Sequence, residues 1–220
     1  MDFYNILEET GIIAILRGVP EDSLEKALDA IYDGGVRLAE ITFEAECPEH
    51  DRKTAAIIKK AVKYVEGRML IGAGTVIRPE QVEFVKAAGG KFIISPNTDT
   101  EIIKSTKAQG LISLPGAMTI SEIVTANSAG ADFVKIFPAS VLGKDFIKQV
   151  KGPLPHIKLL AVSGISPTDV EGYIASGSSG FGIGSAIVNT KLCLQNNFTA
   201  IKENAESYTQ AYKHARGAIK

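Results

Sequence analysis

Eight short apolar segments recur along the chain, and this recurrence constrains the fold more than any other feature of the sequence. Most of them are continuously apolar rather than alternating, which is typical of parallel strands that are covered by helices. Small or turn-forming residues follow each one. The eight predicted strands are Ile12–Leu16, Leu38–Phe43, Met69–Ala73, Lys91–Ser95, Leu111–Leu114, Asp132–Phe137, Lys158–Val162 and Gly180–Ile183.

Segments with helical periodicity lie between most of these strands. In Glu21–Tyr32, for example, Leu24, Leu28 and Ile31 fall on one helical face. Glycines follow several of the segments, at the positions where helices commonly end. The other predicted helices are Phe3–Thr10, Pro79–Ala88, Asp99–Ala108, Ser121–Ala129, Lys144–Val150, Pro167–Ala175 and Asn197–Ala215.

This alternation of strands and helices predicts an α/β protein, a single (β/α)8 TIM barrel with an extra N-terminal helix. An open doubly wound sheet would need two edge strands, and none of the eight segments is polar enough to be an obvious edge. No linker, low-complexity tract or block of charge indicates a domain boundary, so residues 1–220 are predicted to form one barrel domain.

The charge balance and the cysteine count limit the classes of partner. Twenty-four Lys and Arg residues face 25 Asp and Glu residues, which gives no electrostatic reason to expect nucleic acid or an anionic membrane as partner. No segment reaches the roughly 18 apolar residues of a membrane span, and the N-terminus has no signal-peptide core. Cys47 and Cys193 show no metal-ligand spacing and are predicted to be free thiols. We therefore expect a cytoplasmic protein without a metal or other cofactor.

In a TIM barrel, the active site forms where the carboxyl ends of the strands meet the following loops. This rule selects a short set of polar, aromatic and small residues as candidates. They are Arg17, Glu40, Thr75, Ser95-Pro96-Asn97, Pro115-Gly116, Lys135, Phe137, Ser163-Gly164 and Gly184-Ser185.

Lys135 is the most informative candidate, because it stands in the apolar segment Ala131–Pro138 (ADFVKIFP). Burial disfavours the charged form of a lysine and leaves more free amine to attack a carbonyl group. Two structural readings compete with this one. The lysine could pair with a buried carboxylate, or it could bury its stem and extend its ammonium group into water.

Glu40 is a lone carboxylate inside the second predicted strand, where a charge is costly unless it is paired or functional. Strand alternation places Glu40 on the opposite side of the strand from Ala39 and Ile41. If Glu40 faces the barrel interior beside Lys135, it can act as a general base and acid. The competing reading is a structural ion pair with Arg17 or Lys135.

Two turns suit a phosphate group. Ser163–Pro167 and Gly182–Ser185 follow the seventh and eighth strands, where barrels often bind phosphate on backbone N–H groups. Arg17 and Thr75 offer a forked cation and a hydroxyl to a substrate carboxylate, although an ion pair between Arg17 and Glu40 is an equal alternative. The three histidines, His50, His156 and His214, lie away from the strand ends and are predicted to be exposed and non-catalytic.

Taken together, these motifs resemble one known family, the class I 2-keto-3-deoxy-6-phosphogluconate (KDPG) and 4-hydroxy-2-oxoglutarate (KHG) aldolases, including the 6-phosphogalactonate enzymes. The resemblance covers nearly the whole chain, in the same order and spacing. The matching stretches are Ile13–Gly18 (IAILRG), Gly34–Phe43 (GGVRLAEITF), Ile71–Val76 (IGAGTV), Ile94–Asn97 (ISPN), Leu114–Gly116 (LPG), Val134–Ser140 (VKIFPAS), Phe146–Pro155 (FIKQVKGPLP) and Gly182–Val188 (GIGSAIV).

The resemblance implies a homotrimeric, metal-free lyase that cleaves KDPG to pyruvate and glyceraldehyde 3-phosphate, as in the Entner–Doudoroff pathway, and also KHG to pyruvate and glyoxylate. The 6-phosphogalactonate epimer is an alternative substrate. Lys135 corresponds to the Schiff-base lysine and Glu40 to the proton-shuttling carboxylate. Positions near the pyruvoyl carboxylate are Arg17 and Thr75, the pocket walls are Pro96 and Phe137, and the phosphate site is Gly164, Gly184 and Ser185.

Two positions depart from the family pattern. Some members carry a substrate-binding arginine at the position of Glu44, so Arg17 is expected to carry more of the carboxylate binding here. Many members have two glycines where this chain has Ser163-Gly164. Two other functions stay open: a phosphate-binding barrel such as an isomerase or a phosphate synthase that works without an imine, and a barrel that binds a phosphorylated metabolite without turning it over.

Overall fold

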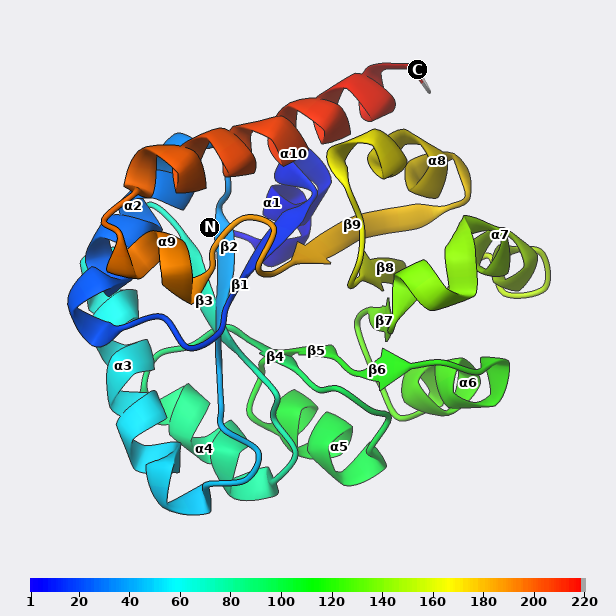
Figure 1. The fold of residues 1–220 in the computed structure, drawn as a ribbon. Helices are drawn as coiled ribbons and strands as arrows, with labels where there is room; N and C mark the ends of the chain where they lie inside the picture. Colours follow the sequence, from blue (N-terminus) through cyan, green and yellow to red (C-terminus); the bar gives the residue numbers. More distant parts are fainter. Residues whose placement is uncertain (219–220) are drawn as a thin grey trace.

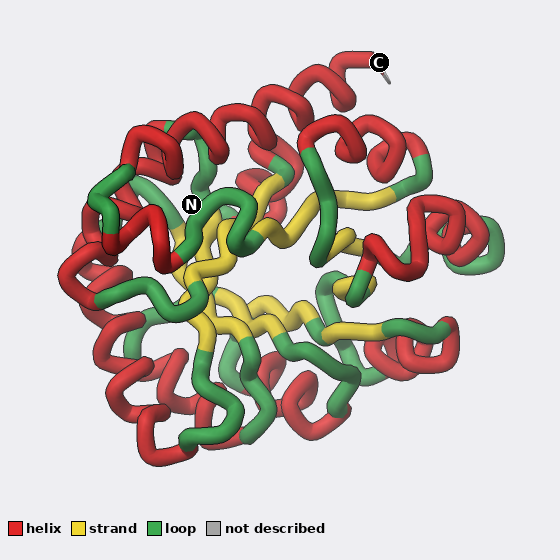
Figure 2. Tube along the Cα trace, in the orientation of Figure 1, coloured by secondary structure: helices red, strands yellow, loops and turns green. Residues whose placement is uncertain are grey.

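A ring of parallel strands surrounded by helices forms the structure, which is a computed structural model describing residues 1–218 (Figures 1 and 2). The predicted domain ends at residue 220, so its last two residues lie outside the described part. The strands are β1 (Ile12–Leu16), β2 (Leu38–Thr42), β3 (Leu70–Gly74), β4 (Phe92–Ile94), β5 (Ile112–Leu114), β6 (Gly116–Ala117), β7 (Val134–Ile136), β8 (Leu159–Val162) and β9 (Ser178–Ile183).

Helix α1 (Phe3–Thr10) precedes the first strand, and the other helices lie around the outside of the ring. They are α2 (Leu24–Asp33), α3 (Asp51–Tyr64), α4 (Pro79–Ala87), α5 (Thr100–Ala108), α6 (Ile120–Ser128), α7 (Ala139–Lys151), α8 (Val170–Ala175), α9 (Thr190–Leu194) and α10 (Phe198–Ala218), with 3-10 turns η1 (Glu21–Ser23), η2 (Pro48–His50) and η3 (Pro167–Asp169). Among the described residues, no helix combines the length and apolarity that a membrane crossing needs.

The sheet order is β5-β4-β3-β2-β1-β9-β8-β7-β6, and every strand pair is parallel. Only Pro115 separates β5 from β6, so the two ends of this order are one interrupted strand and the ring closes there. A proline has no N–H group for the strand ladder, which explains the interruption. Its carbonyl still accepts a hydrogen bond from the Lys135 N–H at 2.8 Å. The predicted TIM barrel with an N-terminal helix is confirmed.

Helix α1 closes the amino-terminal end of the barrel. Its residues Phe3 and Leu7 belong to the apolar cluster that fills the barrel interior, together with Leu38, Phe92 and Phe133. The Phe3 ring centroid lies 5.2 Å from that of Phe92 and 5.8 Å from that of Phe133. Because this end is filled with aromatic and aliphatic side chains, open space remains only toward the carboxyl ends of the strands.

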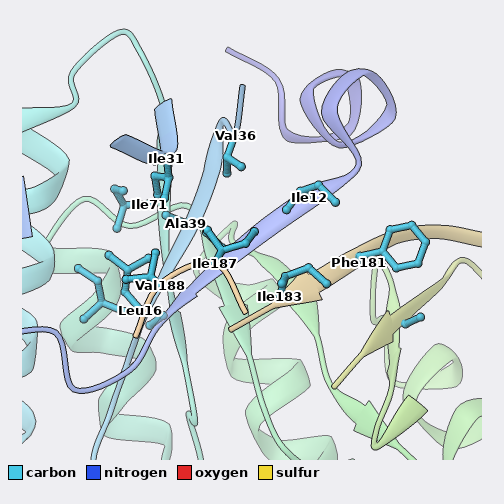
Figure 3. Close-up of a cluster of buried hydrophobic side chains, with 14 of the residues drawn as sticks. Ile12, Leu16, Ile31, Val36, Ala39, Ile71, Phe181, Ile183, Ile187 and Val188 are labelled. Atoms are coloured by element: carbon cyan, nitrogen blue, oxygen red, sulfur yellow. The ribbon is translucent and has the colours of Figure 1, made fainter. Parts of the chain in front are cut away.

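A second apolar cluster lies between the strands and the outer helices (Figure 3). Strand residues that point outward, such as Ile12, Ala39 and Phe181, meet apolar helix residues such as Ile31 there. Helix α10 packs against α2 and α8 on the outside of this layer (Figure 1). The two clusters hold the strands from both sides, which gives the residues at the strand ends a rigid support.

Three helices and strands were not assigned from the sequence, namely α3, α9 and β6, and neither was the 3-10 turn η2. Helix α3 buries Asp51, Thr54, Ile58 and Ala61, of which only Ile58 is large and apolar, so its apolar periodicity is weak. Helix α9 has five residues and β6 has two, lengths at which periodicity carries little information.

Candidate active site

Strand alternation places a carboxylate and an amine inside the barrel. Leu38 and Phe133 point into the interior cluster, and Glu40 and Lys135 follow them two residues further along β2 and β7. Side chains two residues apart on a strand face the same side. Glu40 is 3% exposed and Lys135 is 8% exposed, and both lie on the carboxyl-terminal side of the interior cluster.

A cavity of about 600 Å³ opens at this end of the barrel. Its volume falls within the usual range for small-molecule sites. The nine residues to which the family resemblance gave a role all contribute to its lining: Arg17, Glu40, Thr75, Pro96, Lys135, Phe137, Gly164, Gly184 and Ser185. The other candidates at strand ends, Ser95, Asn97, Pro115 and Gly116, do not line it. Ser163 lines it as well, whereas Glu44 does not. The structure therefore brings together residues that are spread over most of the chain.

Glu40 carries a strongly perturbed carboxyl group. Burial raises its pKa from 4.5 to about 7, even though the positive charges of Lys135 and Arg17 act in the opposite direction. Its Oε2 atom is buried and has no hydrogen-bond partner among the described residues. A buried carboxyl oxygen without a partner is costly, which indicates that a ligand or water completes its coordination.

Lys135 is perturbed in the complementary sense. Burial lowers the pKa of its ammonium group, the Glu40 carboxylate opposes this effect, and Arg17 adds to it. The Nζ atom lies 4.7 Å from the ring centroid of Phe137, which covers one side of the amine. A lysine in this setting supplies free amine at a lower pH than an exposed lysine does.

No salt bridge joins Glu40 to either cation within residues 1–218. The structural readings of Glu40 and Arg17 as members of an ion pair are therefore wrong for this conformation. Lys135 is 8% exposed and lines the cavity. Glu40, Lys135 and Arg17 therefore influence one another electrostatically without direct contact, and all three line the cavity that a substrate can enter.

The backbone next to Glu40 and along the cavity has unusual conformations at a few positions. A Cβ atom added to Gly74 would lie 2.5 Å from the Oε1 atom of Glu40, so only glycine leaves space for the carboxylate. Thr75 and Ser163 adopt positive φ angles of 57° and 83°. Side-chain-bearing residues rarely adopt this conformation, and where they do the strain often marks a functional position.

The turns after β8 and β9 line the cavity through Gly164, Ser185 and Ala186. Within residues 1–218, the N–H groups of Gly164, Ser185 and Ala186 donate no hydrogen bond to the protein. Gly164 has a φ of 70°, and a Cβ atom there would lie within 2.3 Å of the Ser140 Oγ atom. Backbone N–H groups without a protein acceptor, in turns that line a cavity, are available to bind an anion such as phosphate.

Some lining residues were missed by the sequence interpretation. Asn189 and Thr190 begin helix α9, and the Thr190 hydroxyl donates a hydrogen bond to the Gly18 carbonyl at 3.1 Å. The Asn189 side chain caps helix α9 by accepting a hydrogen bond from the Leu192 N–H at 3.0 Å, and an asparagine before a helix is a capping signal that can be recognised in the sequence.

Glu44, which stands where some family members carry a substrate-binding arginine, lies outside the cavity and pairs with His50 at 2.8 Å.

Comparisons with known proteins agree with this chemistry. The family model described as KDPG and KHG aldolase matches residues 3–204. The 2-dehydro-3-deoxy-6-phosphogalactonate aldolase of Escherichia coli K12 is 33% identical over 93% of this chain and 95% of its own length. The KHG/KDPG aldolase of the same strain is 31% identical over 66% of each chain. A solved structure described as native KDPGal superposes with a TM-score of 0.84 at 32% identity, covering 94% of this chain and 96% of the other.

Proposed function

This chain belongs to the KDPG and KHG aldolase family, and we propose that Lys135 forms the imine of its class I aldolase reaction on phosphorylated 2-keto-3-deoxy sugar acids. The protein is an aldehyde-lyase of the KDPG type. One observation carries the assignment of the site: a largely buried lysine shares a cavity with a buried carboxyl group whose Oε2 atom has no hydrogen-bond partner among the described residues.

Lys135 begins the reaction as the nucleophile. Its free amine attacks the C2 ketone of the substrate, and loss of water gives a protonated imine. The positive imine nitrogen accepts the electron pair of the C3–C4 bond as that bond breaks. The lowered pKa of Lys135 favours the first step, because only the unprotonated amine can attack.

Glu40 moves the protons. Its carboxylate removes the proton of the C4 hydroxyl, through a bridging water, as the aldehyde product forms. The protonated carboxyl then returns a proton to C3 of the enamine, and hydrolysis of the resulting imine releases pyruvate. A carboxyl group with a pKa of about 7 both accepts and donates protons readily near neutral pH.

The remaining lining residues hold the two charged ends of the substrate. Arg17 and Thr75 bind the carboxylate next to the imine, while the N–H groups of Gly164 and Ser185 bind the phosphate. Pro96, Phe137 and Gly184 shape the walls between them. The metal-free character of the reaction follows from the imine, which supplies the electron sink that a metal ion would otherwise provide.

We propose the 6-phosphogalactonate epimer as the preferred substrate. The supporting observation is the identity over most of the chain: two phosphogalactonate relatives are 33% and 36% identical over 93% and 81% of this chain, whereas a phosphogluconate relative is 29% identical over 89%. The 6-phosphogluconate epimer is the second candidate and KHG the third. Measuring kcat/KM for all three, with pyruvate release coupled to lactate dehydrogenase, tests this order.

Trapping tests the imine directly. Borohydride added with pyruvate should inactivate the enzyme and leave one reduced pyruvate on Lys135, detectable by peptide mass spectrometry. Lys135→Met should abolish both trapping and turnover. Lys158→Met is the matched control, because Lys158 contacts the Tyr4 ring of α1 at the closed end of the barrel and should retain both. Full activity in Lys135→Met, or turnover insensitive to borohydride, would refute the proposal.

We also propose that the protein is a homotrimer. Apolar side chains stand exposed after the neighbouring strands β6 and β7, and a second copy of the chain can cover them. The exposed fractions are 47% for Met118, 49% for Ile120, 41% for Val124 and 71% for Val141. Light scattering should give the mass of three chains, and Val141→Glu with Ile120→Glu should dissociate the assembly. A monomeric wild type would contradict it.

A further inference from the structure

Three side chains with different metal-binding atoms converge on the segment between β2 and α3. The donor atoms of Glu44, Cys47 and His50 all lie within 4.8 Å of one another. Within residues 1–218 this is the one group of three or more such side chains close enough to share an ion. None of the three lines the catalytic cavity, so the group is separate from the aldolase site.

Local backbone geometry causes this convergence. The Cys47 N–H donates to the Glu44 carbonyl at 3.4 Å, and the His50 N–H donates to the Cys47 carbonyl at 2.9 Å. The first is a turn through Ala45 and Glu46, and the second leads into η2. The two turns bend the backbone on either side of Cys47, and they bring the donor atoms of the three side chains close together.

Arg78 also holds the segment between β2 and α3 in place. Arg78 donates to both carboxylate oxygens of Asp51 at 2.9 Å and to the Ala45 carbonyl at 3.3 Å. Asp51 is 5% exposed and begins helix α3. The backbone that carries the three donors is thus tied to the barrel at both ends, which reduces the conformational entropy that an ion would have to remove on binding.

We propose that Glu44, Cys47 and His50 form a binding site for a divalent transition-metal ion of the Zn²⁺ class. Thiolate and imidazole are the ligands that such ions prefer, and hard ions such as Mg²⁺ and Ca²⁺ do not select them. The neighbouring carboxylates Glu46 and Glu49 add negative charge near Cys47, and water fills the fourth position.

The distances are compatible with this ion class. In a tetrahedral zinc site with bonds of about 2.0–2.3 Å, ligand atoms lie about 3.3–3.8 Å apart. Glu44 Oε2 and His50 Nδ1 lie 2.8 Å apart and need to separate by about 0.5 Å, whereas a pair at the 4.8 Å limit needs to approach by about 1–1.5 Å. The side chains of Glu44 and His50 are 61% and 46% exposed, so rotation about their side-chain bonds can supply the movement.

Cobalt spectroscopy tests the site, because Co²⁺ replaces Zn²⁺ and reports its ligands. Adding Co²⁺ to the reduced protein should give one bound ion per chain and a thiolate-to-cobalt charge-transfer band in the near ultraviolet. Added Zn²⁺ should displace the cobalt and remove the band. Cys47→Ser should lose the band, and His50→Ala should weaken Co²⁺ binding at least tenfold.

Cys193→Ser provides the matched control. Cys193 is 1% exposed in the outer core and has no such cluster around it, so this variant should keep the band. All variants should retain aldolase activity, which confirms folding independently of the metal. The proposal is overturned if wild-type protein shows no thiolate–cobalt band, or if Cys47→Ser binds Co²⁺ with unchanged affinity and spectrum.

Discussion

Replacing Glu40 with glutamine should stabilise the protein while it abolishes most of the activity. Glutamine keeps the shape of the side chain and removes the charge that burial penalises. The fold raises the pKa of Glu40 from 4.5 to about 7. At about 1.4 kcal/mol per pKa unit, the ionised carboxylate costs the folded state about 3 kcal/mol.

The sign of the pH dependence follows from the raised pKa. Between pH 4.5 and about 7 the folded protein binds more protons at Glu40 than the unfolded chain does. The stabilising contribution of protonated Glu40 is therefore complete below the unfolded pKa and is lost as the pH rises through about 7. Lys135, whose pKa is lowered, makes stability rise with pH. Because Glu40→Gln also removes the carboxylate that raises the pKa of Lys135, the difference between the two proteins reports on Glu40 together with its coupling to Lys135.

Urea unfolding of wild type and Glu40→Gln, measured from about pH 5 to about pH 8, gives the difference between their free energies of unfolding at each pH. The stability advantage of Glu40→Gln should grow by roughly 2–3 kcal/mol over that range. The exposed Glu83→Gln on α4 should show no such growth. Turnover of Glu40→Gln should fall by about 100-fold to 10,000-fold, the usual contribution of a general acid–base group. Parallel stability curves for wild type and Glu40→Gln would refute the reasoning.

Three further substitutions probe the support of the site. Gly74→Ala places a Cβ atom 2.5 Å from Glu40 Oε1, so the carboxylate must move and kcat/KM should fall about 100-fold, with an unchanged circular dichroism spectrum. Phe3→Ala empties the closed end of the barrel and should cost about 3–5 kcal/mol in urea unfolding, with kcat nearly unchanged. Ser163→Gly relieves a φ of 83° and should raise Tm by about 2 °C, whereas Ser163→Ala should not; equal Tm values for the two variants would contradict the strain.

The strands and most helices could be predicted because their signals are local. Strand β1, for example, has the predicted bounds Ile12–Leu16, since a continuous apolar run needs burial on both faces wherever it lies. Helix α3 was missed because a helix with one large buried apolar residue gives little periodicity. The fifth predicted strand is divided at Pro115, because β5 pairs with β4 and β6 pairs with β7. The sequence of one segment does not show with which neighbour it pairs.

The membership of the site could also be predicted, because the barrel rule turns positions at strand ends into neighbours. Glu40 and Lys135 were expected to meet, and both line the cavity. The convergence of Glu44, Cys47 and His50 was not expected, because it depends on two successive turns that strand and helix patterns do not describe.

By itself, the sequence determined which residue types stand at the carboxyl ends of the strands, and hence a barrel with Lys135 inside it. Only the tertiary structure decided how those groups behave. The pKa of Glu40, its unpartnered oxygen and the absence of an ion pair with Lys135 in the described residues depend on water exclusion and on distances between segments far apart in the chain. Periodicity reports which face of an element is buried, whereas the free energy of a charge depends on everything packed around it.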